Sequence, residues 1–581
     1  MIMKKWKILP KISSEFRSTY PDVNPVILQL LFNRGLTEKI NINDFLNESP
    51  EFHDPFLFKN MAAAVDLIID HIKKGNKIVV YGDYDADGVT SSVILLETLN
   101  ILHGLVDVYL PDRVSEGYGL NMAAIKQISE RGFKLIITVD NGIRNKEEIS
   151  YAQSLGIDVI VTDHHVLPEK KDMPDCLYID PADSDDNYPW PFLAGVGVAF
   201  KLINALLSRA ELPEKQKKLI SDKCLDLVAV GTVADLVQLL GENRILVREG
   251  LKILNQCKRE GLNELMKAAK INCGRPLEAW NVGWQIGPRL NAASRLAHAN
   301  SAFALLTTTD KEEAEQLAKE LNERNTLRQK ITEEMVAAVE KQIDGDNIPL
   351  VIIGVAEDGD FWNEGVVGLV AGRIAEKYYR PTLIIARVEE GEECFKGSGR
   401  SIEEFNLVAA VESCAGFLDK YGGHPMACGF SLSGKENLAE FKKKMLELAA
   451  KKLGEKELIP TLRIEHELDP ADINLELADQ INRLSPFGQG NPQPRFVSHG
   501  LKIGDIVTMG LDGQHIKIRL SAPEINGRRV QPVWALAFGA AKEYKELKIG
   551  DSIDLVYYLE VNEFNGRREA QLKIIDLKIS D

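Results

Sequence analysis

The chain has 581 residues and a formal net charge of −16, and 45% of its residues are hydrophobic and 27% charged. This length is too great for one ordinary hydrophobic core, and this composition excludes a largely disordered chain. The acidic balance argues against a protein that binds phosphates over its whole surface. It is compatible with a local basic channel beside a carboxylate-rich metal site.

The sequence predicts neither a membrane segment nor a disulfide framework. No uninterrupted apolar stretch reaches the roughly 18 to 20 residues that a membrane helix needs, and no apolar core follows the basic first residues. The seven cysteines are scattered, and no two of them form a CxxC pair, which argues against disulfides or a zinc ribbon. We therefore expect a cytoplasmic protein without a membrane contact. The cysteines are Cys176, Cys224, Cys257, Cys273, Cys394, Cys414 and Cys428.

Between residues 77 and 163, short β-branched runs alternate with helical patterns. The runs KIVVYGD, VDVYL, LIITVD and DVIVTD predict strands, and helices are expected from about Val89 and about Met122. This βαβ rhythm predicts a mostly parallel sheet that is covered on both faces. In such sheets the chemistry lies beyond the carboxyl ends of the strands, which is where Asp83, Asp140 and Asp163 fall.

The middle of the chain predicts more helices and a second α/β unit. Helical patterns from about Pro191 to Lys270 are expected to complete the first domain. The segment from Asp310 to Ile343 predicts one long charged helix, a solvated spacer between two domains. A second α/β unit follows from about residue 348 to about Leu453, and its last helix carries a lysine run that is typical of a solvated face.

From about Leu458 onward, short strands are separated by turn signals. The strongest of these are Asn526-Gly527 and Asn565-Gly566, since Asn-Gly favours a two-residue β-hairpin turn. This pattern predicts a small β-barrel. Its aromatic residues are candidates for base stacking, although most are expected in the core. They are Phe487, Phe496, Trp534, Phe538, Tyr557 and Phe564.

The sharpest chemical signal is the run of aspartates at Asp83, Asp85 and Asp87, directly after a predicted buried strand. Like charges this close repel one another, so a bound divalent cation is the reason to place them together. A helix N-cap would account for only one of these carboxylates. The run also resembles part of a calcium loop, but the twelfth position, which needs a glutamate, is Ile94.

Further candidate ligands follow at later strand ends. Asp140 and the Asp163-His164-His165 run suit manganese or magnesium with mixed carboxylate and imidazole ligands. Asp235 lies inside a strongly apolar helical run, where an unpaired buried charge is costly. The alternative for Asp235 is a buried salt bridge, with Arg289 or Arg295 as the partner.

The order of these motifs resembles that of the RecJ exonucleases of the DHH phosphoesterase family. The motifs DYDADG, PDR with GYG, TVDNG, DHH and GTVAD resemble the RecJ phosphoesterase domain. The motifs GPRLNAASR, GVVGLVAGR, GSGRS and GGHPMACGF resemble its second domain, and PFGQGNPQPRF lies near the start of an OB-type nucleic-acid-binding domain in RecJ. The resemblance spans essentially the full chain.

The resemblance implies an α/β multidomain architecture. It consists of a parallel-sheet DHH domain, a long connecting helix, a smaller α/β DHHA1 domain and a C-terminal OB-type β-barrel. The implied limits are an N-terminal segment at 1–60, the DHH domain at 61–305, the connecting helix at 306–345, the DHHA1 domain at 346–455 and the OB-type domain at 456–581.

The resemblance also implies a site with two divalent metal ions, with manganese preferred and magnesium possible. Asp83, Asp85 and Asp140 would hold one ion, and the other would be held by Asp87, Asp140, His164 and Asp235. Asp140 would bridge the two ions. His165 would contact the scissile phosphate, and Asp163 would orient the histidines.

Several residues are predicted to bind substrate phosphates. A bidentate guanidinium suits a terminal phosphate, so the resemblance implies that some of these residues select the 5′ end of a strand. An ordinary surface or interdomain ion pair is the alternative for each arginine. The candidates are Arg113, Arg289, Arg295, Arg373, Ser398, Arg400 and His424.

The sequence departs from the RecJ pattern at two positions. Asn363 stands where a histidine is common, and Ser294 stands where NAAGR is usual. Neither change touches the implied metal ligands. Both changes are expected to affect the interdomain contacts and the details of substrate binding.

The implied activity is 5′→3′ hydrolysis of single-stranded DNA in repair and recombination. Single-stranded-DNA-binding protein and a helicase are the implied partners, and a monomer is expected. One alternative is a DHH-family phosphodiesterase acting on short oligonucleotides, cyclic dinucleotides or pyrophosphate. Another is a DNA-binding scaffold without catalysis, but such a loss normally erodes metal ligands, and all those expected are present.

Overall fold

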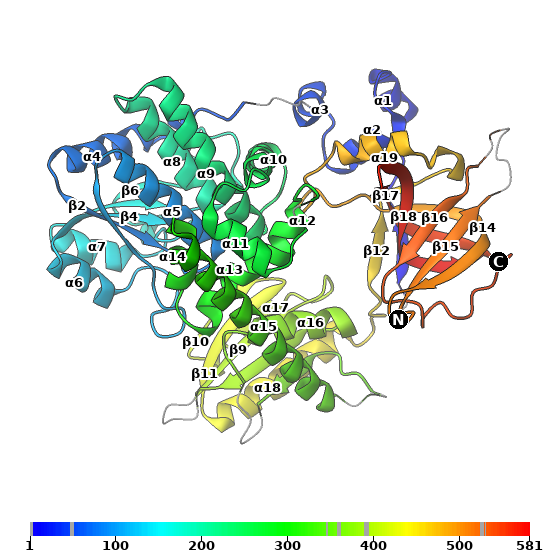
Figure 1. Ribbon diagram of the computed structural model, residues 1–581. Coiled ribbons are helices and arrows are strands. Elements are labelled where there is room, and N and C mark those ends of the chain that lie inside the picture. The colour runs from blue at the N-terminus through cyan, green and yellow to red at the C-terminus, as the bar shows by residue number, and fades with distance from the viewer. Residues whose placement is uncertain are drawn as a thin grey trace.

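The computed structural model describes residues 4–46, 51–272, 274–343, 345, 347–356, 362–388, 394–522, 528 and 530–580. Figure 1 shows a large α/β body at the blue and green end of the chain, a smaller yellow-green body below it, and a β-rich body in orange and red. Within the described residues, no helix has the length and apolarity that a membrane crossing requires. The cysteines in these residues form no disulfide.

The first domain is built on a parallel sheet with the strand order β3-β2-β4-β5-β6. Alternate residues of a strand face opposite sides of a sheet. Ile78 and Val80 therefore pack into one apolar core, while Val79 and Tyr81 pack into another on the opposite face. The predicted doubly covered sheet is confirmed. Its strands are β2 (Lys77–Gly82), β3 (Leu105–Tyr109), β4 (Phe133–Val139), β5 (Asp158–Thr162) and β6 (Leu177–Ile179).

Helices cover both faces of this sheet (Figure 1). Helix α5 begins at Ala86, three residues before the predicted start, because the Asp85 carboxylate caps it by accepting hydrogen bonds from the amides of Asp87 and Gly88. The helices are α4 (Met61–Lys73), α5 (Ala86–Ile101), α6 (Met122–Glu130), α7 (Lys146–Ser154), α8 (Gly195–Arg209), α9 (Glu214–Ala234), α10 (Gly241–Leu254), α11 (Glu260–Ala268), α12 (Ala279–Asn281), a π-helix (Val282–Ile286), α13 (Gly287–Leu296) and α14 (Asn300–Thr307).

A single long helix, α15 (Lys311–Lys341), joins the first two domains. Asp310 caps it by accepting a hydrogen bond of 2.8 Å from the Glu313 amide. Its first half buries Ala314 and Leu321 in the core of the first domain, and its second half buries Val339 against the second domain. The predicted connecting helix is therefore confirmed, and both of its ends are packed.

The second domain has a mixed sheet with the order β10-β11-β9-β8-β7. Only the pair β7 and β8 is parallel. Helix α16 covers one face together with the end of α15, and α17 and α18 cover the other. The elements are β7 (Ile352–Val355), α16 (Val367–Tyr378), β8 (Thr382–Arg387), β9 (Cys394–Arg400), α17 (Leu407–Glu412), β10 (Lys420–His424), β11 (Ala427–Ser433) and α18 (Lys435–Leu453).

The third domain is a β-sheet that closes on itself, because β14 pairs with both β15 and β17. Three strands are longer than the short strands predicted, and bulges in their pairing let them bend. The elements are β12 (Thr461–Ile464), β13 (His466–Glu467), α19 (Leu475–Asn482), β14 (Phe496–Met509), β15 (His515–Ser521), β16 (Val533–Ala537), β17 (Ser552–Phe564) and β18 (Arg567–Ile579).

One of the two predicted hairpin turns falls within the described residues. Asn565 and Gly566 join β17 to β18 with φ values of 50° and 74°. Both φ values are positive, as a type I′ turn requires, so this hairpin prediction is confirmed. The other predicted turn, Asn526-Gly527, lies outside the described residues.

The N-terminal segment packs on the third domain, which the sequence did not predict. Strand β1 (Lys5–Ile8) pairs in parallel with β12, and the blue N-terminal ribbon lies beside the orange and red domain in Figure 1. Helix α2 (Pro25–Asn33) places Leu28 and Leu31 in the same apolar core as Phe496. The two ends of the chain thus share one core. Helices α1 (Ser14–Thr19) and α3 (Lys39–Leu46) complete the segment.

Candidate active site

The ends of three neighbouring strands bring the predicted ligands together. Gly82 pairs with Val139, and Val139 pairs with Thr162, so β2, β4 and β5 end at the same level. The residues that follow are Asp83, Asp140 and Asp163, and all three are buried. Buried carboxylates in a row need a compensating charge or hydrogen bonds.

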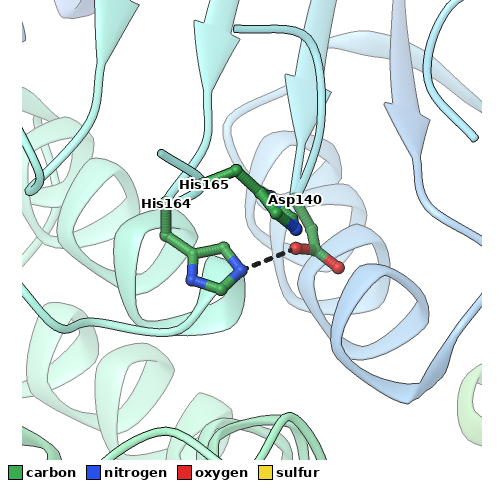
Figure 2. A group of neighbouring side chains, drawn as sticks. All are labelled: Asp140, His164 and His165. Atoms are coloured by element: carbon green, nitrogen blue, oxygen red, sulfur yellow. Dashed lines mark hydrogen bonds and ion pairs between the residues drawn. The ribbon is translucent and has the colours of Figure 1, made fainter. Parts of the chain in front are cut away.

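Three groups of ligand atoms lie at this edge of the sheet, and within each group all atoms are within 4.8 Å of one another. One contains Asp83, Asp85 and Asp140, and a second contains Asp87, His164 and Asp235. The third joins them, because it combines Asp140 and His164 with His165 (Figure 2). The residues predicted as metal ligands are therefore side by side, and Asp140 lies between the two sets.

The Asp87 carboxylate is held by the start of helix α8. It accepts hydrogen bonds from the backbone amides of Gly195 at 2.7 Å and Val196 at 2.9 Å. The N-terminus of a helix stabilises a negative charge in this position. Close packing explains two glycines here: a β-carbon at Gly195 would lie 2.6 Å from Cβ of Asp140, and one at Gly231 would lie 2.8 Å from Oδ1 of Asp87.

The two histidines have different surroundings. Nε2 of His164 lies 3.1 Å from Oδ1 of Asp140, an interaction drawn in Figure 2, and 3.7 Å from Oδ2 of Asp235. Nδ1 of His165 lies 2.8 Å from Oδ1 of Asp163, whose other oxygen accepts a hydrogen bond from the Ile143 amide. The Ile143 amide therefore holds one oxygen of Asp163 in place, while the other oxygen contacts His165.

The electrostatics of this cluster favour a bound cation. Burial, reinforced by the neighbouring carboxylates, raises the pKa values of Asp83, Asp140 and Asp235, and it raises the pKa of Asp87 to about 7. Burial and the charge of His165 lower the pKa of His164 to about 4, so its imidazole is neutral and able to ligate.

One buried atom supports the same interpretation. Oδ1 of Asp83 has no hydrogen-bond partner among the residues that the structure describes. A buried carboxylate oxygen without a donor is costly, and a hard divalent cation satisfies it. The carboxylate and imidazole donors present here therefore fit a divalent metal ion.

These pKa values predict how the stability of the metal-free chain depends on pH. The pKa of Asp87 is raised from 3.8 to about 7, so protonation of this carboxyl stabilises the folded state. This stabilisation is complete below pH 4 and is lost as the pH rises through 7. With chelator present, we expect wild type to lose on the order of 1–4 kcal/mol more unfolding free energy than Asp87→Asn between pH 5 and pH 8. Urea titrations of both proteins measure this difference. Equal losses of unfolding free energy in wild type and Asp87→Asn would contradict a raised pKa of Asp87.

Two polar residues at the site were not singled out from the sequence. The Tyr118 hydroxyl donates a hydrogen bond of 3.1 Å to the Asp140 carbonyl and lies 3.0 Å from Nδ1 of His165. Oδ1 of Asn291 accepts a hydrogen bond of 2.7 Å from the Ala86 amide, beside the aspartate run. The available signal was their place inside the motifs GYG and NAASR.

A cavity of about 420 Å³ lies between the first and second domains and is lined by residues of both. Among its lining residues are four of the predicted phosphate ligands, Arg113, Arg295, Ser398 and Arg400. The Arg113 guanidinium lies 4.8 Å from the centre of the Tyr84 ring, and Tyr84 stands between Asp83 and Asp85, so Arg113 brings the cavity close to the aspartate run. The Arg400 guanidinium donates to Oγ of Ser398 at 3.3 Å.

The other three predicted phosphate ligands do not line this cavity. Arg289 donates hydrogen bonds to the Gln285 carbonyl and to Oδ1 of Asn322. Arg373 lies 4.0 Å from Glu333 on α15, and His424 is exposed at the end of β10. Their substrate roles stay predictions.

The proposed salt-bridge partners of Asp235 are engaged elsewhere. Arg295 donates a hydrogen bond of 2.7 Å to the Gly365 carbonyl in the second domain. The Asp235 carboxylate instead faces His164. Of the two departures from the RecJ pattern, Asn363 accepts a hydrogen bond from the Gly365 amide, and so it shapes this same interdomain contact. Ser294 is buried, and its hydroxyl donates to the Asn291 carbonyl at 3.4 Å.

The aromatic residues of the third domain divide between core and surface. Phe496 and Tyr557 are buried, and Phe487 packs against the same core. Phe538 and Phe564 are exposed. The Lys517 ammonium lies 4.4 Å from the centre of the Trp534 ring. The surface residues are the ones available to bases.

Three family models match successive parts of the chain. The DHH family N-terminal domain matches residues 77–232, the DHHA1 domain matches residues 347–451, and the RecJ OB domain matches residues 464–576. These matches confirm the expected order of a DHH domain, a DHHA1 domain and an OB domain.

Curated relatives match nearly the whole chain. The single-stranded-DNA-specific exonuclease RecJ of Bacillus subtilis is 38% identical over 563 residues, which cover 96% of this chain and 68% of that protein. The exonuclease of the same name from Escherichia coli is 35% identical over 536 residues, covering 88% of this chain and 89% of that protein. Both alignments extend across all three domains.

Solved structures agree with the fold. RecJ from Thermus thermophilus, crystallised in complex with Mn²⁺, superposes with a TM-score of 0.81 at 30% identity, covering 99% of this chain and 80% of that one. An exonuclease RecJ bound to manganese gives a TM-score of 0.58 at 35% identity, covering 69% of this chain and 98% of that one. From these family models, relatives and structures together, the chain belongs to the RecJ family.

Proposed function

We propose that this chain is a metal-dependent exonuclease that hydrolyses single-stranded DNA in the 5′→3′ direction. The observation that carries the proposal is the meeting of carboxylates and imidazoles from separate strand ends beside an arginine-lined cavity. The relatives named for this activity in Bacillus subtilis and Escherichia coli support it. Repair and recombination of DNA are the processes that such an activity serves.

We propose that two divalent ions bind, with manganese preferred over magnesium. Asp83, Asp85 and Asp140 would hold one ion, and the group of Asp87, His164 and Asp235 would hold the other with Asp140. Two such ions, when bound, lower the pKa of a shared water and stabilise the attacking and leaving oxygens. The two RecJ structures that contain manganese support a metal-dependent reaction.

The protein residues position the substrate. His165, held by Asp163, would donate a hydrogen bond to the scissile phosphate. The raised pKa of His165 suits this role, since the Asp163 contact favours the protonated ring although burial opposes it. Arg113, Arg295, Ser398 and Arg400 would hold a terminal 5′ phosphate in the cavity.

The preference for a 5′ phosphate provides a prediction. Arg400→Ala removes a charged donor from the cavity, so the ratio of kcat/KM for 5′-phosphorylated over 5′-hydroxyl strands is expected to fall about 10- to 100-fold. Arg209→Ala, which removes a surface arginine that pairs with Asp66 and does not line the cavity, is the matched control. If the ratio of kcat/KM values for the two kinds of strand is unchanged in Arg400→Ala, the cavity does not bind the 5′ phosphate.

The OB-type domain would bind the strand ahead of the site, and a single-stranded-DNA-binding protein and a helicase would supply the substrate. The chain would act as a cytoplasmic monomer. The exposed aromatic residues Phe538 and Phe564 and the lysine-covered Trp534 are the surface features of this domain that support strand binding.

A time course on end-labelled DNA with manganese tests the activity. We expect a 5′ label to leave as a short product at once, a 3′-labelled strand to shorten gradually, and a fully double-stranded substrate to resist. Release of the 3′ label first would contradict the direction. Digestion confined to short oligonucleotides or cyclic dinucleotides would contradict the substrate.

A further inference from the structure

A loop of the third domain, the PFGQGN loop at 486–491, lies against the segment that follows the candidate metal ligand Asp235. The Leu239 amide donates a backbone hydrogen bond of 2.7 Å to the Gln489 carbonyl in this loop. Leu239 is buried in the core of the first domain, and the next residue, Leu240, packs against the core of the third domain. The chain that leaves Asp235 therefore joins the two cores.

Two glycines give the PFGQGN loop its close fit to this segment. A β-carbon at Gly488 would lie 2.6 Å from Cδ1 of Leu239. One at Gly490 would lie 3.0 Å from Cβ of Gln238, and Gly490 also has a φ of 73°, which residues other than glycine adopt rarely. A side chain at either position would therefore push the loop and the segment apart.

Buried side chains hold the PFGQGN loop in place. Asn491 is buried, and its amide donates hydrogen bonds of 2.8 Å to the carbonyls of Leu484 and Pro486. Nε of Arg34 in the N-terminal segment donates a hydrogen bond of 2.6 Å to Oδ1 of Asn491. From α10 of the first domain, the buried Arg244 guanidinium donates a hydrogen bond of 2.7 Å to the Leu484 carbonyl. The loop is therefore fixed from two directions.

The residue next to Asp235 has an unfavourable backbone conformation. Leu236 has a φ of 61°, and a leucine keeps this left-handed conformation only where the surrounding structure holds it. The Leu236 side chain is 72% exposed, so the support comes from the neighbouring backbone. On one side the Asp235 amide donates 2.9 Å to the Gly231 carbonyl within α9, and on the other Leu239 is bonded to the loop. The PFGQGN loop thus holds one end of the turn that carries Asp235.

We propose that the PFGQGN loop is a positioning element for Asp235, so that docking of the third domain sets how tightly the ion beside Asp235 is bound. This inference rests on the proposed two-ion site. Asp235 lies 3.7 Å from His164 in one ligand group, and the affinity of a metal site depends on the contacts that orient its ligands. The chain then holds its full metal complement only when its strand-binding domain is docked.

The test is a calorimetric titration of the full chain with manganese. In Gly488→Ala/Gly490→Ala, the affinity for one of the two ions is expected to fall about 10-fold or more, with the other affinity within about twofold of wild type. Asp235→Asn should weaken the same ion and so identifies it. Gly500→Ala is the matched control, since Gly500 is another glycine of the third domain with a φ of 64° and open space around it.

A second variant, Arg244→Ala, releases the loop without adding a side chain. It should weaken the same ion, and Arg244→Lys, which keeps a charged donor, should weaken it less. Thermal melting shows which variants are folded. Manganese affinities equal to those of wild type in the folded glycine pair or in folded Arg244→Ala would overturn the proposal and leave these contacts as a domain anchor. Wild type that binds fewer than two ions would instead contradict the proposed two-ion site.

Discussion

The variant Asp140→Ala is expected to lose metal-dependent digestion of single-stranded DNA, with kcat lowered at least about 1,000-fold. Asp140 is the residue shared by the two sets of candidate ligands, since it groups with Asp83 and Asp85 and also with His164. Its φ of 63° lies in the left-handed region, which residues other than glycine adopt rarely and which aspartate tolerates better than most. The backbone is thus held in a conformation that turns this carboxylate between the two groups.

The measurement is the rate of nucleotide release from a labelled single strand at saturating manganese. Asp70→Ala removes a surface carboxylate that pairs with Lys74, an exposed contact worth only a few tenths of a kcal/mol, and serves as the control. Its rate should equal that of wild type. Wild-type digestion by Asp140→Ala would exclude the cluster as the catalytic centre.

The variant His165→Ala is expected to lower kcat by about 100- to 1,000-fold, because it removes one positioned donor to the phosphate. Its KM and its metal content should change little, since His165 is the outermost member of the cluster and contacts Asp163. Manganese titration followed by single-turnover kinetics separates these quantities. A parallel loss of bound metal would assign His165 as a metal ligand, which its grouping with Asp140 and His164 also allows geometrically.

Much of the metal site could be predicted because its chemistry is local to strand ends. Parallel strands end at one edge of a sheet, so Asp83, Asp140 and Asp163 were expected at that edge, and the pairing of β2 with β4 and of β4 with β5 makes them neighbours there. Asp235 was predicted from the cost of a buried charge, and it lies 3.7 Å from His164. Such inferences need only the periodicity of nearby residues.

Features that depend on distant packing were not predictable. The pairing of β1 with β12 and the shared core of α2 and the third domain join segments more than 400 positions apart, and no local pattern encodes that contact. For the same reason the sequence could not show which of the predicted phosphate ligands line the cavity and which lie elsewhere. Arg113 and Arg400 meet at the cavity, while Arg373 lies beside Glu333.

Side chains far apart in sequence are expected to form a pocket for two cations. Crystals soaked in manganese and measured at its absorption edge test this directly. We predict two anomalous peaks about 3.5–4 Å apart, one beside Asp83 and Asp85 and one beside Asp87 and Asp235, with Asp140 between them. A single peak, or peaks away from these carboxylates, would contradict a two-ion site.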